Sequence, residues 1–373
     1  MLPRISILGA GHSGCALAVD LHARGFEVLL HAHPCHRRQL DAIEHAGRLR
    51  ADGVCSATCR PTTTTSLQRA LEHADRLLIT LPAYAHEELI TSLASHDLRR
   101  HTLVCITGNF FALAARHRLD AQAIVETSTS PFSCRVNGHT VYIKGRKAMM
   151  YAAALGTLGL QQRQAVEALF PQPLVWLPSV LANSLSCVTG VMHPTPALMN
   201  AGRIESTGGD FHFYREGMTA GVARVMSSVD TERLLIADSL GITLPPALNL
   251  MNDYYRQSFG SLAEFARESV EHNSRKSAPD SLTHRYLMQD VPYVLVPWRA
   301  LARRMGVATP TIDAVIQLTA QANSIALVSG SRTLRRLGLH GLEPQQLRAL
   351  ARGEDITGVR GSSGRTTCEA VAV

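Results

Sequence analysis

The chain has 373 residues, of which 46% are hydrophobic and 18% are charged, which is the balance of a globular protein of two or three domains. No apolar run reaches the roughly 18 residues that a transmembrane helix requires. A strand-like segment begins within four residues of Met1 and leaves no room for a signal peptide. The sequence therefore predicts a cytoplasmic protein that has no membrane partner.

The formal net charge is +7, and all but three of the 37 basic side chains are arginines. The three lysines are Lys144, Lys147 and Lys276. A basic chain invites a nucleic-acid interpretation. However, the arginines are scattered and aromatic residues make up only 5% of the chain, so we expect no nucleic-acid partner. Small anionic ligands remain compatible with the charge.

The eight cysteines follow no disulfide framework, which favours reduced thiols. Cys55 and Cys59 are separated by three residues, but no second pair of ligands completes a zinc site. We therefore expect no structural metal.

Short β-like runs alternate with helical spacing over the first 130 or so residues. The strands are expected at 5–8, 28–31, 77–81, 103–106 and 124–126, and the helices at 13–24, 66–73 and 86–95. This alternation predicts an α/β Rossmann domain, a doubly wound parallel sheet with helices on both faces. A further β-like run at 140–144 is expected to join that sheet or its edge.

The pattern changes near residue 177, where strand signals become scarce and helical periodicity dominates. Long helices are expected at 219–240, 295–305 and 311–328. We therefore expect a Rossmann domain at 1–176 and an all-α substrate domain at 177–352. The tail at 353–373 is rich in Gly, Ser, Thr and charged residues and is expected to be disordered.

A glycine pattern lies between the first predicted strand and the first predicted helix. The pattern is G-x-G-x-x-G, formed by Gly9, Ala10, Gly11, His12, Ser13 and Gly14. In dinucleotide-binding folds its glycines allow a tight turn, close approach of a pyrophosphate, and close packing of helix on strand. The helix N-terminus adds N–H donors for the phosphates. These six residues are predicted to bind the cofactor, and Pro82, at the end of a later strand, to line its other side.

The cofactor is predicted to be NADP(H), with NAD(H) as the alternative. An NAD site usually places an acidic side chain at the end of the second strand. Here no acid precedes Asp41, whereas Arg37 and Arg38 could hold a 2′-phosphate. The nearby group of His31, His33, Cys35 and His36 also resembles a set of metal ligands. Its expected position beside the adenosine ribose favours a loop role instead.

Several segments resemble the opine dehydrogenases, the octopine and nopaline synthase family. They are VETSTSPFSCR at 125–135, VMHPTPALMN at 191–200, FYREG at 213–217, DTERL at 230–234 and HRYLMQDVPY at 284–293. The resemblance runs from the glycine loop to about residue 310, and the second and last of these segments are the most specific. It implies NAD(P)H-dependent reductive condensation: an α-keto acid and an amino acid form an imine, which is reduced to an opine.

The resemblance also implies roles for individual residues. His193 would be the general acid/base and Asp290 its paired carboxylate, while Arg285 would hold the carboxylate of a pyruvate- or 2-oxoglutarate-type keto acid. Thr127 and Asn109 fall where the family contacts that keto acid. The chemistry suits these side chains, because imidazole titrates near neutral pH and the Arg guanidinium binds carboxylates bidentately.

Three other functions remain open. The first is an opine-metallophore synthase that uses a histidine-derived amine, although such chains tend to be longer. The second is a ketopantoate-reductase-like 2-keto acid reductase, which would rely on a helical lysine near the start of its second domain. Lys144 and Lys147 lie too early in the chain for that role, and Lys276 lies in a polar loop.

The third alternative is a non-catalytic Rossmann protein that senses NADPH. His193, Arg285 and Asp290 are all present, which favours an enzyme. Each of them also has a simpler interpretation: His193 could be a surface or core histidine, Asp290 could cap a helix, and Arg285 could form a surface ion pair. The oligomeric state is open, and a homodimer is compatible with the sequence.

Overall fold

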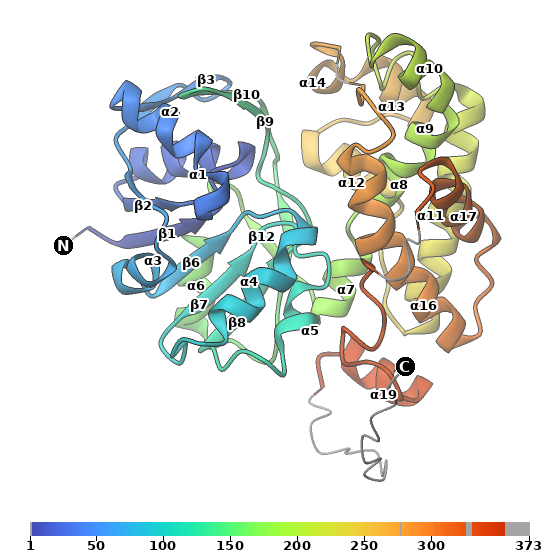
Figure 1. Ribbon diagram of the computed structural model, residues 1–373. Helices are drawn as coiled ribbons and strands as arrows, with labels where there is room; N and C mark the ends of the chain where they lie inside the picture. Colours follow the sequence, from blue (N-terminus) through green and yellow to red (C-terminus); the bar gives the residue numbers. More distant parts are fainter. Residues whose placement is uncertain (1, 277, 326–329, 355–373) are drawn as a thin grey trace, which may run out of the picture.

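A computed structural model describes residues 2–276, 278–325 and 330–354 of the chain (Figure 1). An N-terminal half built around sheets lies beside a helical half. The last strand ends at Trp176 and the first helix of the helical half begins at Val180. Most of the tail predicted to be disordered, from residue 355 onward, lies outside the described residues.

The N-terminal half contains an eight-stranded sheet with the order β12-β11-β8-β7-β6-β1-β2-β5. The strands are β1 (Arg4–Leu8), β2 (Glu27–His31), β5 (Thr62–Thr64), β6 (Arg76–Ile79), β7 (Thr102–Cys105), β8 (Ala123–Thr127), β11 (Met150–Ala154) and β12 (Leu174–Trp176). The strands from β5 to β8 are parallel, and β11 runs antiparallel to β8. The predicted Rossmann fold and its five strands are confirmed.

Helices cover both faces of this sheet, so alternate side chains of a strand enter different cores. Ile7 packs in the cluster that contains α1 (His12–Ala23), whereas Leu8 packs in the cluster that contains α3 (Leu67–His73). The other helices of this half are α2 (Arg38–Ala46), α4 (His86–Leu93), α5 (Phe111–Ala115) and α6 (Leu160–Glu167), with short 3₁₀ turns at η1 (Pro34–His36) and η2 (Ala83–Ala85). Burial on both faces explains why the strands read as continuous apolar runs.

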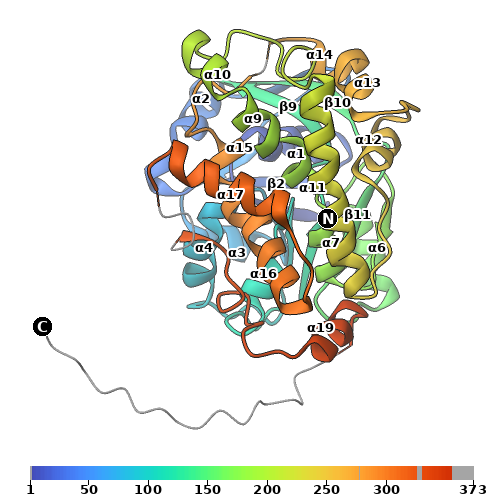
Figure 2. The same ribbon diagram turned by 90° about the vertical axis from the view of Figure 1, so that its right-hand side faces the viewer.

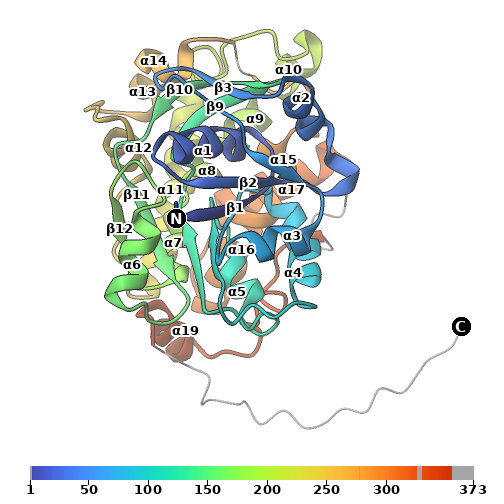
Figure 3. The same ribbon diagram turned by 90° about the vertical axis from the view of Figure 1, so that its left-hand side faces the viewer.

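The prediction that 140–144 joins the main sheet is wrong. This segment forms β10 (Thr140–Arg146) in a second sheet of order β4-β3-β10-β9, with β3 (Leu49–Gly53), β4 (Ala57–Cys59) and β9 (Phe132–Asn137). Gly138, at φ 55°, forms the turn that pairs β10 with β9 as a hairpin. Helix α1 lies between the two sheets (Figure 3), so the second sheet covers the helix that starts at the glycine loop.

Among the described residues the second half contains helices and no strand. The helices are α7 (Val180–Leu185), α8 (Thr189–Met192), α9 (Pro194–Met199), α10 (Ala201–Thr207), α11 (Ala220–Ser239), α12 (Ala247–Tyr255), α13 (Leu262–Glu268), α14 (Val270–Asn273), α15 (Arg285–Met288), the π-helix η3 (Val291–Leu295), α16 (Val296–Met305), α17 (Pro310–Ala322) and α19 (Pro344–Ala351). Helix α11 is the longest of them and packs against α16 and α17 (Figure 2). None of the described helices is long and apolar enough to cross a membrane.

Helix α17 is shorter than the predicted helix at 311–328. It ends at Ala322, and Ser324 adopts a left-handed φ of 52°, which breaks the helical path. Residues 326–329 of the predicted helix lie outside the described part of the chain. The predicted helices at 219–240 and 295–305 are confirmed as α11 and α16.

The DTERL segment at 230–234 forms a buried ion pair within α11. Arg233 is fully buried in α11, pairs with Asp230 at 2.7 Å, and donates to the backbone oxygens of Leu185 and Pro245 at 2.9 Å. Glu232 accepts hydrogen bonds from the first backbone N–H groups of α17. The segment therefore joins α11 to its neighbours and lies outside the reaction centre.

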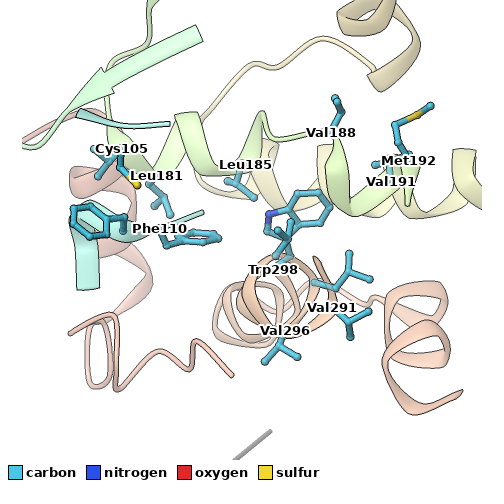
Figure 4. Close-up of a cluster of buried hydrophobic side chains, with 14 of the residues drawn as sticks. Cys105, Phe110, Leu181, Leu185, Val188, Val191, Met192, Val291, Val296 and Trp298 are labelled. Atoms are coloured by element: carbon cyan, nitrogen blue, oxygen red, sulfur yellow. The ribbon is translucent and has the colours of Figure 1, made fainter. Parts of the chain in front are cut away.

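The indole of Trp298 in α16 holds α8 in place. Its cluster includes Leu185, Val188, Val191 and Val291 (Figure 4). A Cβ at Gly190 of α8 would lie 2.9 Å from the indole, so the two helices meet at a distance that only glycine allows. Because α8 ends directly before His193, this packing fixes the position of the predicted acid/base.

Candidate active site

A cavity of about 1240 Å³ lies between the two halves. Its wall includes the glycine loop, the 3₁₀ turns η1 and η2, strand β9, and the region around α8 and α15. The predicted cofactor loop and the predicted chemical residues therefore face one common space.

The glycine loop has the geometry that its sequence predicts. Gly9 adopts φ +122°, and its N–H donates to the oxygen of His31 at 2.9 Å. A Cβ at Gly14 would lie 1.8 Å from the oxygen of Gly9, so α1 packs on the loop without a side chain. A Cβ at Gly11 would meet no protein atom within 4 Å, and this residue lines the cavity. The loop therefore leaves its cavity side open for a phosphate to approach.

His12 and Ser13 link the loop to the strands that follow β8. Nδ1 of His12 accepts the backbone N–H of Val136 at 3.0 Å, and the Ser13 hydroxyl lies 3.0 Å from that of Ser130. Burial and, to a lesser extent, the charge of the nearby Arg135 lower the pKa of His12 to about 4. The imidazole is therefore neutral near pH 7 and has its N–H on Nε2.

Arg37 and Arg38, the two arginines predicted to bind a 2′-phosphate, lie in different environments. Arg38 lines the cavity together with His33 and His36, whereas Arg37 pairs with Asp41 at 2.7 Å on the surface. Pro82 lines the wall of the same cavity. Within the described residues, no group of three or more His, Cys, Asp or Glu side chains could hold a metal ion.

His193 and Asp290 meet although 97 positions separate them in the chain. Nδ1 of His193 lies 2.7 Å from Oδ2 of Asp290, and the carboxylate is 1% exposed. His193 stands at the break between α8 and α9, where Pro194 starts the second helix. Its ring stacks on Tyr286 with 4.0 Å between the centroids. The pair leaves Nε2 of His193 as the ring nitrogen available to a substrate.

Asp290 and Arg285 depart from their simpler interpretations. Asp290 is the N-cap residue of η3, but its side chain makes no capping hydrogen bond and bonds to His193 instead. Arg285 begins α15 and lines the cavity, and it forms no ion pair with any residue that the structure describes. Its charge contributes to the lowered pKa values of His12 and His284. The guanidinium is thus available to a carboxylate.

Thr127 and Asn109 lie behind the cavity wall. The Thr127 hydroxyl accepts the backbone N–H of Thr107 at 3.2 Å and donates to the oxygen of Thr129 at 2.8 Å. Asn109 is 3% exposed, and its Oδ1 accepts a hydrogen bond from Cys187. Their neighbours Thr107 and Thr129 line the cavity instead. The structure thus brings together His193, Asp290, Arg285 and the glycine loop, while these two residues support the wall.

A turn with three left-handed residues follows β7. The residues are Thr107 at φ 58°, Asn109 at 48° and Phe110 at 67°. Arg332, from the segment after α17, is buried and donates to the backbone oxygens of Gly108 and Asn109 and to Nδ1 of His86. Burial lowers the pKa values of Arg332 and His86. This buried network holds a backbone conformation that side chains disfavour.

Sequence reasoning missed several side chains of the wall. Gln289 is 2% exposed, and its Oε1 accepts no hydrogen bond in the described part of the chain. Lys144 and Lys147 line the cavity, although the sequence had assigned them no role in the site. Lys144 lies on β10 and Lys147 lies between β10 and β11, so neither is the helical lysine of a ketopantoate-type enzyme. Only the scarcity of lysine could have drawn attention to them.

Comparison with known proteins supports the same architecture. Residues 176–323 match the family described as NAD/NADP octopine/nopaline dehydrogenase, alpha-helical domain. Residues 5–155 match the ketopantoate reductase PanE/ApbA family, so the N-terminal half alone does not separate the candidate enzyme classes.

Individual relatives cover nearly the whole chain. An opine dehydrogenase of Arthrobacter sp. (strain 1C) is 30% identical, over 92% of this chain and 97% of the relative. A solved octopine dehydrogenase with NADH and L-arginine has a TM-score of 0.74 at 18% identity, covering 95% of this chain and 98% of that one. A yersinopine dehydrogenase with NADP+ has a TM-score of 0.70 at 18% identity, with 94% and 98% covered.

The resemblance, the fold and the enzyme class predicted from the sequence are therefore confirmed. The helical half distinguishes this chain from the ketopantoate reductases that share its N-terminal half. The chain belongs to the opine dehydrogenase family, whose members are NAD(P)-dependent oxidoreductases acting on CH–NH bonds.

Proposed function

We propose that this protein is an opine dehydrogenase that joins an α-keto acid to the amine of an amino acid and reduces the product with NAD(P)H. One observation carries the proposal: the His193–Asp290 pair, at 2.7 Å, faces the same cavity as the open glycine loop. Arg285 in the same wall adds a cation that has no carboxylate partner among the described residues. A cofactor site, a proton-transfer group and a carboxylate anchor are the three parts that this reaction needs.

His193 moves the protons of the condensation. Its Nε2 accepts a proton from the attacking amine and returns one to the departing hydroxyl, so that water leaves and an imine forms. Asp290 holds Nδ1–H and stabilises the imidazolium that arises in between. Because the carboxylate is almost completely buried, its interaction with the imidazolium is screened little by solvent.

Arg285 orients the keto acid. Its guanidinium binds the carboxylate through two parallel hydrogen bonds and so fixes which face of the imine is exposed. Thr127 acts through the wall, where its hydroxyl holds Thr107 and Thr129 at the cavity surface. Asn109 supports the wall from behind, where its Oδ1 accepts a hydrogen bond from Cys187. NAD(P)H, when bound, supplies the hydride that reduces the imine carbon, and a proton completes the secondary amine.

NADPH is the preferred cofactor in this proposal. The residues that follow β2 place Arg38, His33 and His36 in the cavity wall. At that end no carboxylate of the described chain lines the wall to hold the ribose hydroxyls of NAD. The guanidinium of Arg38 can hold a 2′-phosphate. Arg37, which is paired with Asp41, takes no part. The ratio of kcat/KM for NADPH and NADH measures this preference, and a large advantage for NADH would contradict it.

The reaction is tested by a screen of keto acids against amines, with NADPH oxidation and mass spectrometry of the product as readouts. Pyruvate and 2-oxoglutarate are crossed with the common amino acids and with histidine-derived amines. We expect a secondary amine whose mass equals keto acid plus amine minus one oxygen. Oxidation of NADPH by a keto acid alone would favour the ketone-reductase alternative. Absence of any product would favour the sensor.

A further inference from the structure

Lys147 is a buried cation in the wall of the cavity. The residue is 8% exposed, and its Nζ donates to the backbone oxygen of Ser130 at 2.9 Å. It forms no ion pair with any side chain in the described ranges. Its Nζ lies 5.7 Å from the ring centres of both Tyr254 and Tyr255. A backbone oxygen and two aromatic faces thus surround a charged group that has no counter-ion.

This environment is costly for an ammonium group. Removing a charge from water without pairing it is strongly unfavourable, and cation–π contacts recover only a part of the cost. Burial accordingly lowers the pKa of Lys147 to about 8. An anionic group of a ligand would complete the environment.

The cavity wall cannot supply that anion itself. Among the residues that line it, five are Lys or Arg, namely Arg38, Arg135, Lys144, Lys147 and Arg285. Glu271 is the one lining carboxylate among the described residues, and it already accepts hydrogen bonds from Gln257 at 3.0 Å and from Ser269 at 3.1 Å. The cavity is therefore suited to ligands that carry several negative charges.

A row of aromatic rings in tilted and edge-to-face contact connects Lys147 to the reaction centre. This aromatic row consists of Tyr286, Phe213, Tyr214, His272 and Tyr255, with centroid separations of 4.5 to 5.7 Å between successive rings. Tyr286 stacks on His193 at one end, and Tyr255 faces the ammonium of Lys147 at the other. Burial, with the charges of Lys147 and His193, lowers the pKa of His272 to about 3. The row thus stays uncharged between the acid/base and the second cation.

We propose, on the basis of the proposed function, that Lys147 binds a carboxylate of the amine donor, as Arg285 binds that of the keto acid. The part of the amine donor that lies beyond the reacting nitrogen then extends along the aromatic row. Two cations at separate places in the wall then select a product that carries a carboxylate from each substrate. The carboxylate belongs either to the α-carbon or to an acidic side chain, and the experiment distinguishes them.

The test combines substitutions with two pairs of probe donors. L-Arginine and agmatine differ by the α-carboxylate, and L-glutamate and L-glutamine differ by the side-chain charge. A charge-assisted hydrogen bond predicts that Lys147→Met raises KM about 10- to 100-fold for every donor that carries the bound carboxylate and leaves KM unchanged for a donor that lacks it. A loss shared by arginine, glutamate and glutamine, with agmatine unchanged, identifies the α-carboxylate, and a loss confined to glutamate identifies the side chain.

Two further variants control for general damage. Lys276→Met removes the exposed lysine that pairs with Asp210 at 2.7 Å, and it should leave all four donors unchanged. Lys147→Arg keeps the charge and should recover a large part of the lost affinity.

Lys147→Met should fold with an equal or higher urea midpoint. The gain in free energy of unfolding of Lys147→Met over wild type should be full below pH 8. It should shrink as the pH rises towards 10.5, because folded wild type then binds fewer protons than the unfolded chain and becomes more stable.

Equal losses for both members of each pair would overturn the inference, as would a loss confined to the keto-acid KM or to NADPH affinity. If wild type forms no product with any donor, the proposed function fails instead. Calorimetric binding of the four donors to wild type and Lys147→Met in the presence of NADP+ then decides the role of Lys147 separately.

Discussion

The two ends of the cavity are assembled in different ways. The phosphate-binding part of the cofactor end comes from one continuous segment, in which β1, the glycine loop and α1 follow each other directly. The chemical end joins His193 to Asp290 across 97 positions, through the packing of α8 against η3 and α16. The first can therefore be recognised from its local sequence. The second exists only after the helical half has folded.

This difference predicts how substitutions at the two ends behave. A change at the cofactor end should alter nucleotide affinity while the proton-transfer pair stays intact. A change at the chemical end should alter turnover while nucleotide affinity stays intact. A variant at the cofactor end that alters turnover, or one at the chemical end that alters nucleotide affinity, would show that the two ends are coupled through the wall they share.

The largest effect is expected for His193→Ala. Loss of the general acid/base should lower kcat by about 10²- to 10⁴-fold, and the affinity for NADPH, measured by fluorescence, should not change. His22→Ala removes an exposed imidazole from the last turn of α1 and serves as the control. Unchanged turnover in His193→Ala would remove this residue from the mechanism.

Arg285→Ala should act on one substrate only. Loss of the guanidinium should raise the KM for the keto acid about 10- to 100-fold, since hydrogen bonds between charged groups contribute about 1.5 to 3 kcal/mol. Steady-state kinetics with each substrate varied in turn measures this effect. Arg285→Lys keeps the charge without the planar fork, and its KM for the keto acid should lie between those of wild type and Arg285→Ala. An unchanged KM for the keto acid would place the carboxylate elsewhere.

Gly11→Ala should weaken NADPH binding without a loss of stability. Its Cβ meets no protein atom within 4 Å but projects towards the space where the phosphates approach. The expected loss of affinity is about tenfold, or about 1.4 kcal/mol. Gly202→Ala, which is equally open but lies in α10, should leave binding unchanged. Gly14→Ala places a Cβ 1.8 Å from the Gly9 oxygen and should prevent the loop from folding.

The smallest effect is expected for Arg38→Ala. Exposed charge pairs contribute roughly 0 to 1 kcal/mol, so kcat/KM for NADPH should fall by only a few fold and that for NADH should stay the same. Arg37→Ala, which breaks only the surface pair with Asp41, should change neither value. A larger loss in Arg37→Ala than in Arg38→Ala would reverse the assignment of the 2′-phosphate ligand.

Local pattern predicted those parts of the molecule whose contacts are close in sequence. The five strands of the Rossmann sheet and the glycine loop belong to this group, because strand, turn and helix are consecutive. The run at 140–144 was assigned to the wrong sheet. Its partner β3 lies some 90 positions earlier, and an alternating pattern shows which face of a strand is buried but not which strand lies beside it.

The chemical end shows the same limit more strongly. His193, Asp290 and Arg285 were found through the resemblance of whole segments, and their spacing alone would have singled out none of them. Thr127 and Asn109 were found in the same way, but the structure turns their side chains into the wall. Lys147 has no motif around it, so its place in the cavity becomes visible only when β9, β10 and α12 are brought together.

The segment after α17, which carries Arg332, bonds to the nucleotide-binding half. The segment that carries it follows the whole helical half, yet its guanidinium satisfies the carbonyl groups of the turn after β7, and the Gly338 oxygen accepts a hydrogen bond from Arg116. The same segment also bonds to the helical half, where Arg304 donates to the oxygen of Leu342 and Arg348 donates to that of Ser239, so it bridges the two halves. A chain cut at the boundary read from the sequence would leave those backbone groups unsatisfied, so the two halves should not be separable as independently expressed modules.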